Sequence, residues 1–105
     1  MEIVETSVFT RQLLALLTDE EYRKLQAALA SKPTLGAVIP GSGGIRKVRW
    51  GLGGRGKRGG ARIVYYWAVS RDLLLMLFLF AKGERDDLTP EQLRELRAVV
   101  KKEFR

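Results

Sequence analysis

The segment from Leu73 to Ala81, LLLMLFLFA, is the longest uninterrupted apolar stretch of the chain. A helix that crosses a bilayer needs about 20 apolar residues, so this stretch is far too short to span a membrane in that way. A strand whose side chains are apolar on both faces must be covered on both faces by other elements. The stretch therefore predicts a central strand in a sheet that carries helices, and we expect no membrane partner.

Three other segments have the composition of β-strands. They cover residues 2–8, 45–52 and 61–69, which are rich in β-branched and aromatic side chains. The triplet SRD at 70–72 predicts the tight turn between the last two strands. Residues 33–44, with two prolines and four glycines, predict a loop that crosses to the sheet from a helical layer.

Three helices follow from apolar spacing and from capping signatures. Phe9, Leu13 and Leu16 have the spacing of a first helix, and TDEE at 18–21 is a capping box that starts a second one. Pro33 ends the second helix, and TPEQ at 89–92 opens a final one. We therefore predict one α+β domain over residues 1–105 with the order β-α-α-β-β-β-α.

The charges of the chain are strongly segregated along the sequence. The net charge is +7, yet residues 22–71 hold eleven lysines and arginines and no acid, while the remainder holds eight bases and all twelve acids. Such a block is typical of a face that binds a polyanion, and nucleic acid is the first candidate. A solvated basic surface without a partner is the alternative.

The chain contains no cysteine and no histidine. This excludes disulfides, thiolate nucleophiles, cysteine zinc sites and every catalytic arrangement that needs a histidine base. The N-terminal sequence MEIVETSVFTR lacks the apolar run of a signal peptide, so we expect a cytoplasmic protein.

Four cations on neighbouring predicted strands form the candidate catalytic site. Alternate strand residues share a face, so Lys47 and Arg49 project together; hairpin pairing brings Arg62 close, and Lys82 follows the last strand. Arginines can stabilise the extra negative charge when a ribose 2′-OH attacks the adjacent phosphorus. Crowding by cations lowers the pKa of a lysine, so Lys47 or Lys82 can move a proton. Phosphate binding without turnover is the equal alternative.

Further residues are candidates for binding RNA or the ribosome. The segment GLGGRGKRGG at 51–60 partly matches dinucleotide and P-loop motifs, but a strand is expected after it where both motifs require a helix. A basic hairpin loop that follows a phosphate backbone is the better interpretation, with a solvated connector as the alternative. Tyr66 shares the Arg62 face and can stack on a base, although core packing is favoured for this aromatic triplet. The candidate binding residues are Arg46, Arg55, Lys57, Arg58 and Tyr66.

Three segments carry a resemblance to a known family: GSGGIRKVRW, GKRGGARIVYYW, and the apolar strand with its exit KGERDDLT. Over nearly its whole length the chain resembles the RelE superfamily of bacterial type II toxins, particularly the HigB-like branch. The resemblance implies a four-stranded, largely antiparallel sheet flanked by helices. It also implies cutting of mRNA in the ribosomal A site without metal or cofactor. The implied partners are the ribosome with its rRNA, mRNA, and a cognate antitoxin of the helix-turn-helix type.

The resemblance also assigns roles by position. Lys47 and Arg49 match the two basic residues of the family's second strand, Arg62 matches the arginine that opens the third, and Lys82 matches the basic turn after the last strand. Gly83 stands where the family pattern has an arginine, and Thr89 stands where it has a tyrosine. Lys57 or Arg58 from the glycine-rich loop can substitute for these two family residues as acid or base. The rival functions are a ParE-like inhibitor of DNA gyrase and a non-enzymatic RNA-binding or ribosome-associated module.

Overall fold

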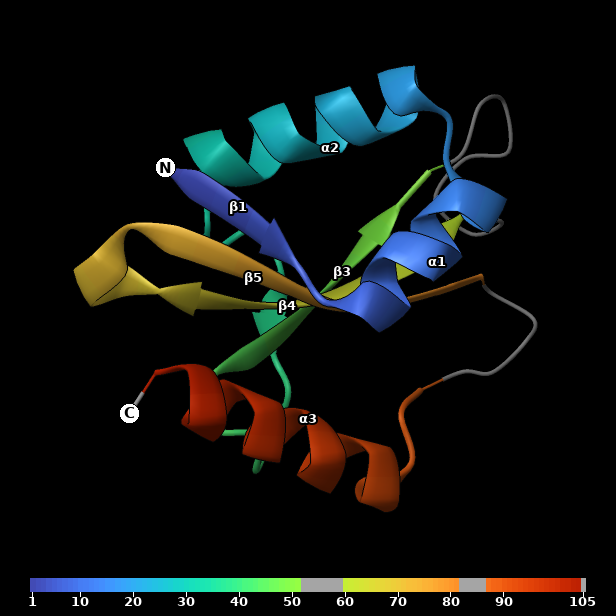
Figure 1. The fold of residues 1–105 in the computed structure, drawn as a ribbon. Helices are drawn as coiled ribbons and strands as arrows, with labels where there is room; N and C mark the ends of the chain where they lie inside the picture. Colours follow the sequence, from blue (N-terminus) through green and yellow to red (C-terminus); the bar gives the residue numbers. More distant parts are fainter. Residues whose placement is uncertain (52–59, 82–86, 105) are drawn as a thin grey trace.

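The computed structural model describes residues 1–51, 60–81 and 87–104. Within these ranges the chain forms three α-helices, five strands and one 3-10 turn (Figure 1). In chain order these are β1 (Glu2–Glu5), α1 (Ser7–Leu16), α2 (Asp19–Ser31), β2 (Ala37–Val38), β3 (Ile45–Trp50), β4 (Ala61–Ala68), η2 (Val69–Arg71), β5 (Leu73–Ala81) and α3 (Pro90–Glu103). In this part of the chain no helix is both long and apolar enough to cross a membrane.

The strands form one mixed sheet in the order β1-β5-β4-β3-β2. The apolar segment is β5, an inner strand between β1 and β4 with most of its side chains buried, as predicted. The prediction of a four-stranded sheet is wrong in strand number, because the sheet has five strands. The sheet is mixed: β2, β3, β4 and β5 pair antiparallel, and β1 pairs with β5 in parallel, after the long connection that parallel strands need.

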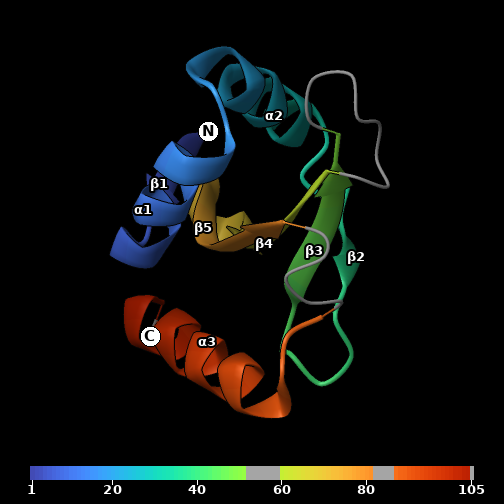
Figure 2. The ribbon, with the colours of Figure 1, turned by 90° about the vertical axis from the view of Figure 1, so that its right-hand side faces the viewer.

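The fifth strand is β2, which lies in the segment that we predicted as a loop. β2 pairs antiparallel with Arg46 and Lys47 at the edge of the sheet (Figure 2). It has only two residues, Ala37 and Val38. Gly36 precedes it, and Pro40 follows it after one residue. A strand this short leaves no period-2 pattern in the sequence, so only its pairing with β3 defines it.

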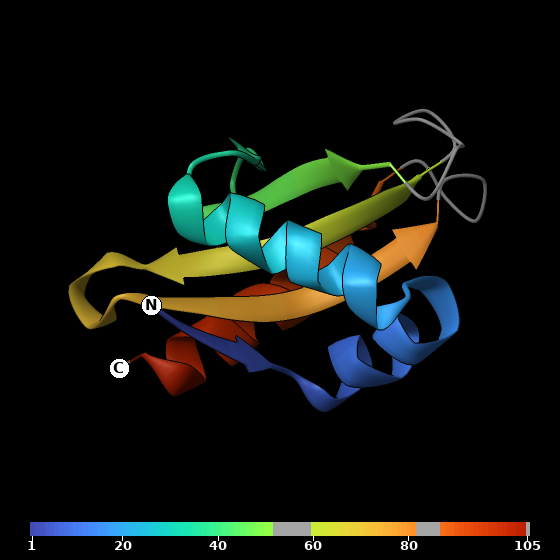
Figure 3. The same cartoon turned by 90° about the horizontal axis from the view of Figure 1, so that it is seen from above.

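Helices cover both faces of the sheet, as the apolar β5 requires. α1 and α2 lie on one face and α3 on the other (Figure 1), and seen from above α2 crosses the strands while α3 lies behind them (Figure 3). The α1/α2 face is packed around Phe9, Leu25 and Leu29, and the α3 face around Ile45 and Val64. These two apolar layers fix which side chains of each strand face which helix.

The element boundaries follow the capping residues. Thr18 and Thr89 each cap a helix through a complete capping box, as predicted from TDEE and TPEQ. The predicted opening strand over residues 2–8 is too long, because the Thr6 hydroxyl accepts a hydrogen bond from the Phe9 amide and starts α1. Val69 likewise leaves β4 for η2, which Asp72 ends in a left-handed conformation (φ 49°).

Tyr65 anchors the segment before β2 to the face of the sheet that α1 and α2 cover. Its side chain is fully buried, and its hydroxyl donates to the Pro33 carbonyl (2.7 Å) and accepts from the Gly36 amide (2.9 Å). Burial raises the pKa of Tyr65, so the hydroxyl keeps the proton that it donates. The same segment also receives a hydrogen bond from Arg46, whose guanidinium donates to the Gly36 carbonyl (2.8 Å).

Removing this hydroxyl should destabilise the protein. Tyr65→Phe leaves the Gly36 amide and the Pro33 carbonyl without their partner, and we expect a loss of about 2 kcal/mol in the free energy of unfolding. Urea denaturation measures the loss. Tyr66→Phe is the matched control, because the Tyr66 hydroxyl makes no hydrogen bond to any residue that the structure describes. Equal stabilities for the two variants would contradict the anchoring role.

Candidate functional site

Two neighbouring strands bring three of the predicted cations to one face of the sheet. In the antiparallel ladder of β3 and β4, Arg49 lies directly opposite Arg62, and Lys47 lies opposite Val64. Val64 belongs to the apolar layer beneath α3, so these side chains all lie on the α3 face. The prediction that Lys47 and Arg49 share a face and that Arg62 lies beside them is confirmed.

The three cations differ in their access to solvent. Arg49 is exposed, the Lys47 side chain is one quarter exposed (25%), and Arg62 is 7% exposed. Side chains directly opposite each other in an antiparallel pair have Cβ atoms about 5 Å apart. The site therefore combines an exposed arginine on β3 with a buried arginine directly opposite it on β4. A phosphate can contact the first without any rearrangement of the strands.

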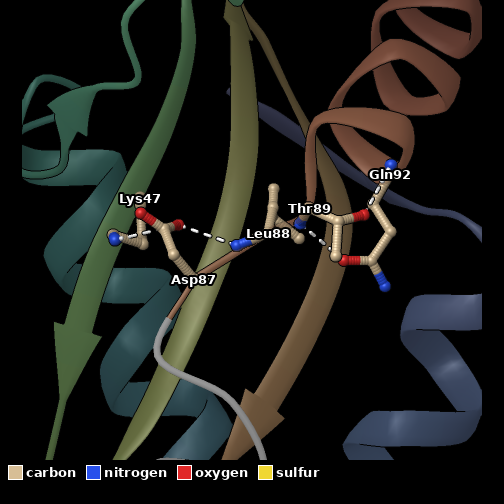
Figure 4. Close-up of polar contacts among 5 residues, drawn as sticks. All are labelled: Lys47, Asp87, Leu88, Thr89 and Gln92. Atoms are coloured by element: carbon tan, nitrogen blue, oxygen red, sulfur yellow. Dashed lines mark hydrogen bonds and ion pairs between the residues drawn. The ribbon is translucent and has the colours of Figure 1, made fainter.

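An acid that sequence reasoning did not select completes the described part of the site. Asp87 Oδ1 lies 3.2 Å from Lys47 Nζ and also accepts a hydrogen bond from the Leu88 amide (2.8 Å), as Figure 4 shows. The capping box of Thr89 and Gln92 holds the start of α3 next to this pair (Figure 4). The signal for it in the sequence was the pair of aspartates at 86 and 87, which stands two residues before the capping signature TPEQ.

The Lys47 contact affects the ionisation of Asp87. Partial burial of Asp87 raises its pKa. The hydrogen bond from the Leu88 amide and the charge of the Lys47 ammonium outweigh this effect and hold the pKa of Asp87 below its usual range. A carboxyl group with a lowered pKa in the folded state stabilises the fold above its unfolded pKa of about 3.9. This contribution disappears as the pH falls through the lower, folded-state pKa.

Asp87→Asn should therefore alter the pH dependence of stability. Compared with the wild type, we expect the variant to have a lower Tm above about pH 4, and the difference should vanish at more acidic pH. Both partners are partly exposed, so the difference is small, and thermal unfolding over a pH series measures it. Lys47→Ala should remove the part of this pH dependence that comes from the ion pair and keep the part that comes from the Leu88 amide. A Tm difference that persists unchanged at low pH would contradict the ion-pair explanation.

Two predicted RNA-binding residues lie away from this cluster. Arg46 points to the opposite face from Lys47 and is half-buried, with its guanidinium bonded to the Gly36 carbonyl. Tyr66 does lie on the Arg62 face, as predicted, but its ring packs against Phe104 with centroids 5.5 Å apart. The local structure thus uses both side chains to hold the fold together.

The other predicted site residues lie outside the described ranges. They are Lys82 among the catalytic candidates, and Arg55, Lys57 and Arg58 among the binding candidates. Gly83, one of the two departures from the family pattern, lies there as well, while Thr89 is a helix cap. A strand, β4, follows the glycine-rich segment, which agrees with our rejection of the P-loop and dinucleotide motifs.

The chemistry available to this arrangement is that of anion binding and charge stabilisation. Among the described residues, no group of three or more histidines, cysteines, aspartates and glutamates is placed to hold a metal ion. Two guanidinium groups can form bidentate hydrogen bonds with phosphate oxygens, and an ammonium group beside them can add a third positive contact.

No protein-family model matches this chain.

Proposed function

We propose that this protein is the toxin of a type II toxin-antitoxin system and cleaves mRNA bound to the ribosome. The observation that carries the proposal is the cross-strand pair of Arg49 and Arg62, with Lys47 on the same face. Two guanidinium groups that lie side by side can bind the oxygens of one phosphate together through bidentate hydrogen bonds. A protein-directed toxin of the ParE type has no need of such a pair, and this favours the endoribonuclease over the gyrase inhibitor.

The reaction requires an in-line attack by a ribose 2′ oxygen on the neighbouring phosphorus. The 2′ hydroxyl loses a proton, the new P–O bond forms, and the bond to the 5′ oxygen breaks as that oxygen takes up a proton. The products are a 2′,3′-cyclic phosphate and a 5′ hydroxyl. In this proposal Arg49 binds the non-bridging oxygens of the phosphate. Arg62, directly opposite it on β4, adds a second positive charge that stabilises the negative charge of the transition state. Lys47 and Lys82 are the candidates for moving the protons.

The biological setting of the proposal comes from the resemblance to the RelE/HigB family. The toxin acts in the cytoplasm, where the ribosome positions the mRNA over the cation cluster. A cognate antitoxin of the helix-turn-helix type neutralises it. The protein uses neither a metal nor a small-molecule cofactor.

A non-enzymatic RNA-binding module is the second candidate. The pair of Arg49 and Arg62 is equally compatible with it, because guanidinium groups keep their charge and bind phosphate without moving a proton. Under this alternative, the cations hold a phosphate group and no bond breaks.

Mapping of an mRNA on translating ribosomes separates these functions. We expect primer extension on a defined message to reveal new 5′ ends within codons after incubation with the protein. An intact message at equimolar protein and ribosome would refute the nuclease and leave the binding module. Inhibition of DNA supercoiling by gyrase, together with an intact message, would instead identify the gyrase inhibitor.

A further inference from the structure

The outer side of α3 carries a second group of exposed cations. Arg94, Arg97 and Lys101 surround a shallow hollow of about 260 Å³, and Ala98 is the other described residue that lines it. All four are exposed. Residues three, four and seven apart on a helix lie on the same side, so the three cations form one continuous stripe. We call Arg94, Arg97 and Lys101 the α3 stripe.

Glu95 and Arg97 lie on different long sides of α3. Glu95 lines a cavity that α3 shares with the start of α1 and with β5. Arg97 lies on the other side, where a Cβ atom added to Gly43 would be 4.0 Å from its Nε. Gly43 belongs to the connection that leads directly into β3, the strand that carries Lys47 and Arg49. The stripe therefore lies on the side of α3 that faces the start of this strand.

We infer that the α3 stripe is a second phosphate-binding surface, which holds the RNA backbone outside the segment that contacts Lys47, Arg49 and Arg62. The choice of RNA rests on the proposed function. Arg94 and Lys101 are about 10 Å apart along the helix axis, at 1.5 Å per residue. One strand of a duplex carries a charge about every 3.4 Å of helix axis, so this span is longer than one charge spacing. The stripe is thus long enough to contact successive phosphates.

The chemistry of the stripe fits a phosphate backbone better than an acidic protein. Stable protein interfaces depend on apolar and aromatic anchors that fill pockets. Within the part of the chain that the structure describes, the only apolar lining of this hollow is the small Ala98 side chain. Contacts to nucleic-acid backbones, in contrast, consist mainly of arginine and lysine on phosphate oxygens and need no apolar anchor. The stripe would add affinity for RNA without taking part in bond cleavage.

The test compares two triple variants that lose the same side chains from different faces. Arg94→Ala/Arg97→Ala/Lys101→Ala removes the stripe. Arg11→Ala/Arg23→Ala/Lys24→Ala removes two arginines and one lysine that are exposed on α1 and α2, across the sheet. Circular dichroism and Tm verify that both variants fold.

The probe is a 2′-O-methyl RNA of about 16 nucleotides, which lacks the attacking hydroxyl and so stays intact. Its affinity is measured between about 50 and 200 mM salt. Each phosphate contact contributes about 0.7 to the slope of log affinity against log salt for a single strand, so loss of the stripe should reduce the slope by about 2. The control variant should keep the wild-type slope.

Equal slopes for the two triple variants would overturn the inference. A stripe variant that keeps the RNA slope but loses affinity for polyglutamate would also overturn it and would assign the surface to an acidic protein. A reduced slope supports the inference even when the wild-type protein leaves mRNA intact on ribosomes, a result that refutes only the nuclease. Cleavage by the wild type together with equal slopes refutes only the stripe.

Discussion

Replacement of Arg49 by alanine is expected to slow mRNA cleavage by about 100- to 1000-fold, the usual effect of removing one donor that stabilises charge in a transition state. Arg49 is the exposed member of the cross-strand pair with Arg62, so it is the guanidinium that a phosphate meets first. Its loss leaves the fold intact, because an exposed side chain rarely contributes more than about 0.5 kcal/mol to stability.

The rate is measured in single turnover on ribosomes that carry a defined mRNA. Arg49→Lys retains the charge but not the planar fork, so it should fall between the wild type and the alanine variant. Arg23→Ala, an exposed arginine of α2 on the other side of the sheet, is the control and should cleave at the wild-type rate. Full activity in a folded Arg49→Ala protein would remove Arg49 from the site.

The local patterns of the sequence predicted most of what brings the site together. The alternation of strand side chains predicted the shared face of Lys47 and Arg49, and the spacing of the last three strands predicted that Arg62 lies beside them. The capping boxes fixed the starts of α2 and α3. These features depend on a few neighbouring residues, so they can be recognised without knowledge of the tertiary structure.

The features that were missed depend on contacts between distant parts of the chain. Asp87 forms an ion pair with Lys47 although the two lie 40 positions apart in the sequence. The role of Arg46 depends on the chain before β2 folding back against β3, where the Gly36 carbonyl accepts its hydrogen bond. Charge alone placed Arg46 among the RNA contacts, and charge does not distinguish a surface ligand from an internal tether.

Gly36 shows how closely the segment before β2 and the candidate site are connected. A Cβ atom at Gly36 would lie 2.9 Å from the carbonyl oxygen of Lys47 and 2.9 Å from a ring carbon of Tyr65. The Lys47 carbonyl belongs to the backbone of β3, and the Tyr65 ring is fully buried, so neither can move without disturbing the sheet. Only glycine allows the chain to pass this close to the strand that carries Lys47.

Gly36→Ala should therefore cost about 3 kcal/mol in the free energy of unfolding, the upper part of the usual range for overpacking. Urea denaturation gives this value. Gly41→Ala is the control. It places a Cβ atom where φ is +73° but where no described residue other than its chain neighbours has an atom within 4 Å, so only backbone strain of about 1 kcal/mol is expected.

The Gly36 variant should also cleave more slowly under conditions in which it is fully folded, because the displaced backbone moves Lys47 away from its position beside Arg49. The Gly41 control should cleave normally once folded, since it leaves β3 in place. A Gly36→Ala protein that matches the wild type in both stability and cleavage would show that the segment before β2 does not support this strand. Lys47 would then owe its position to the pairing of β3 with β4 alone.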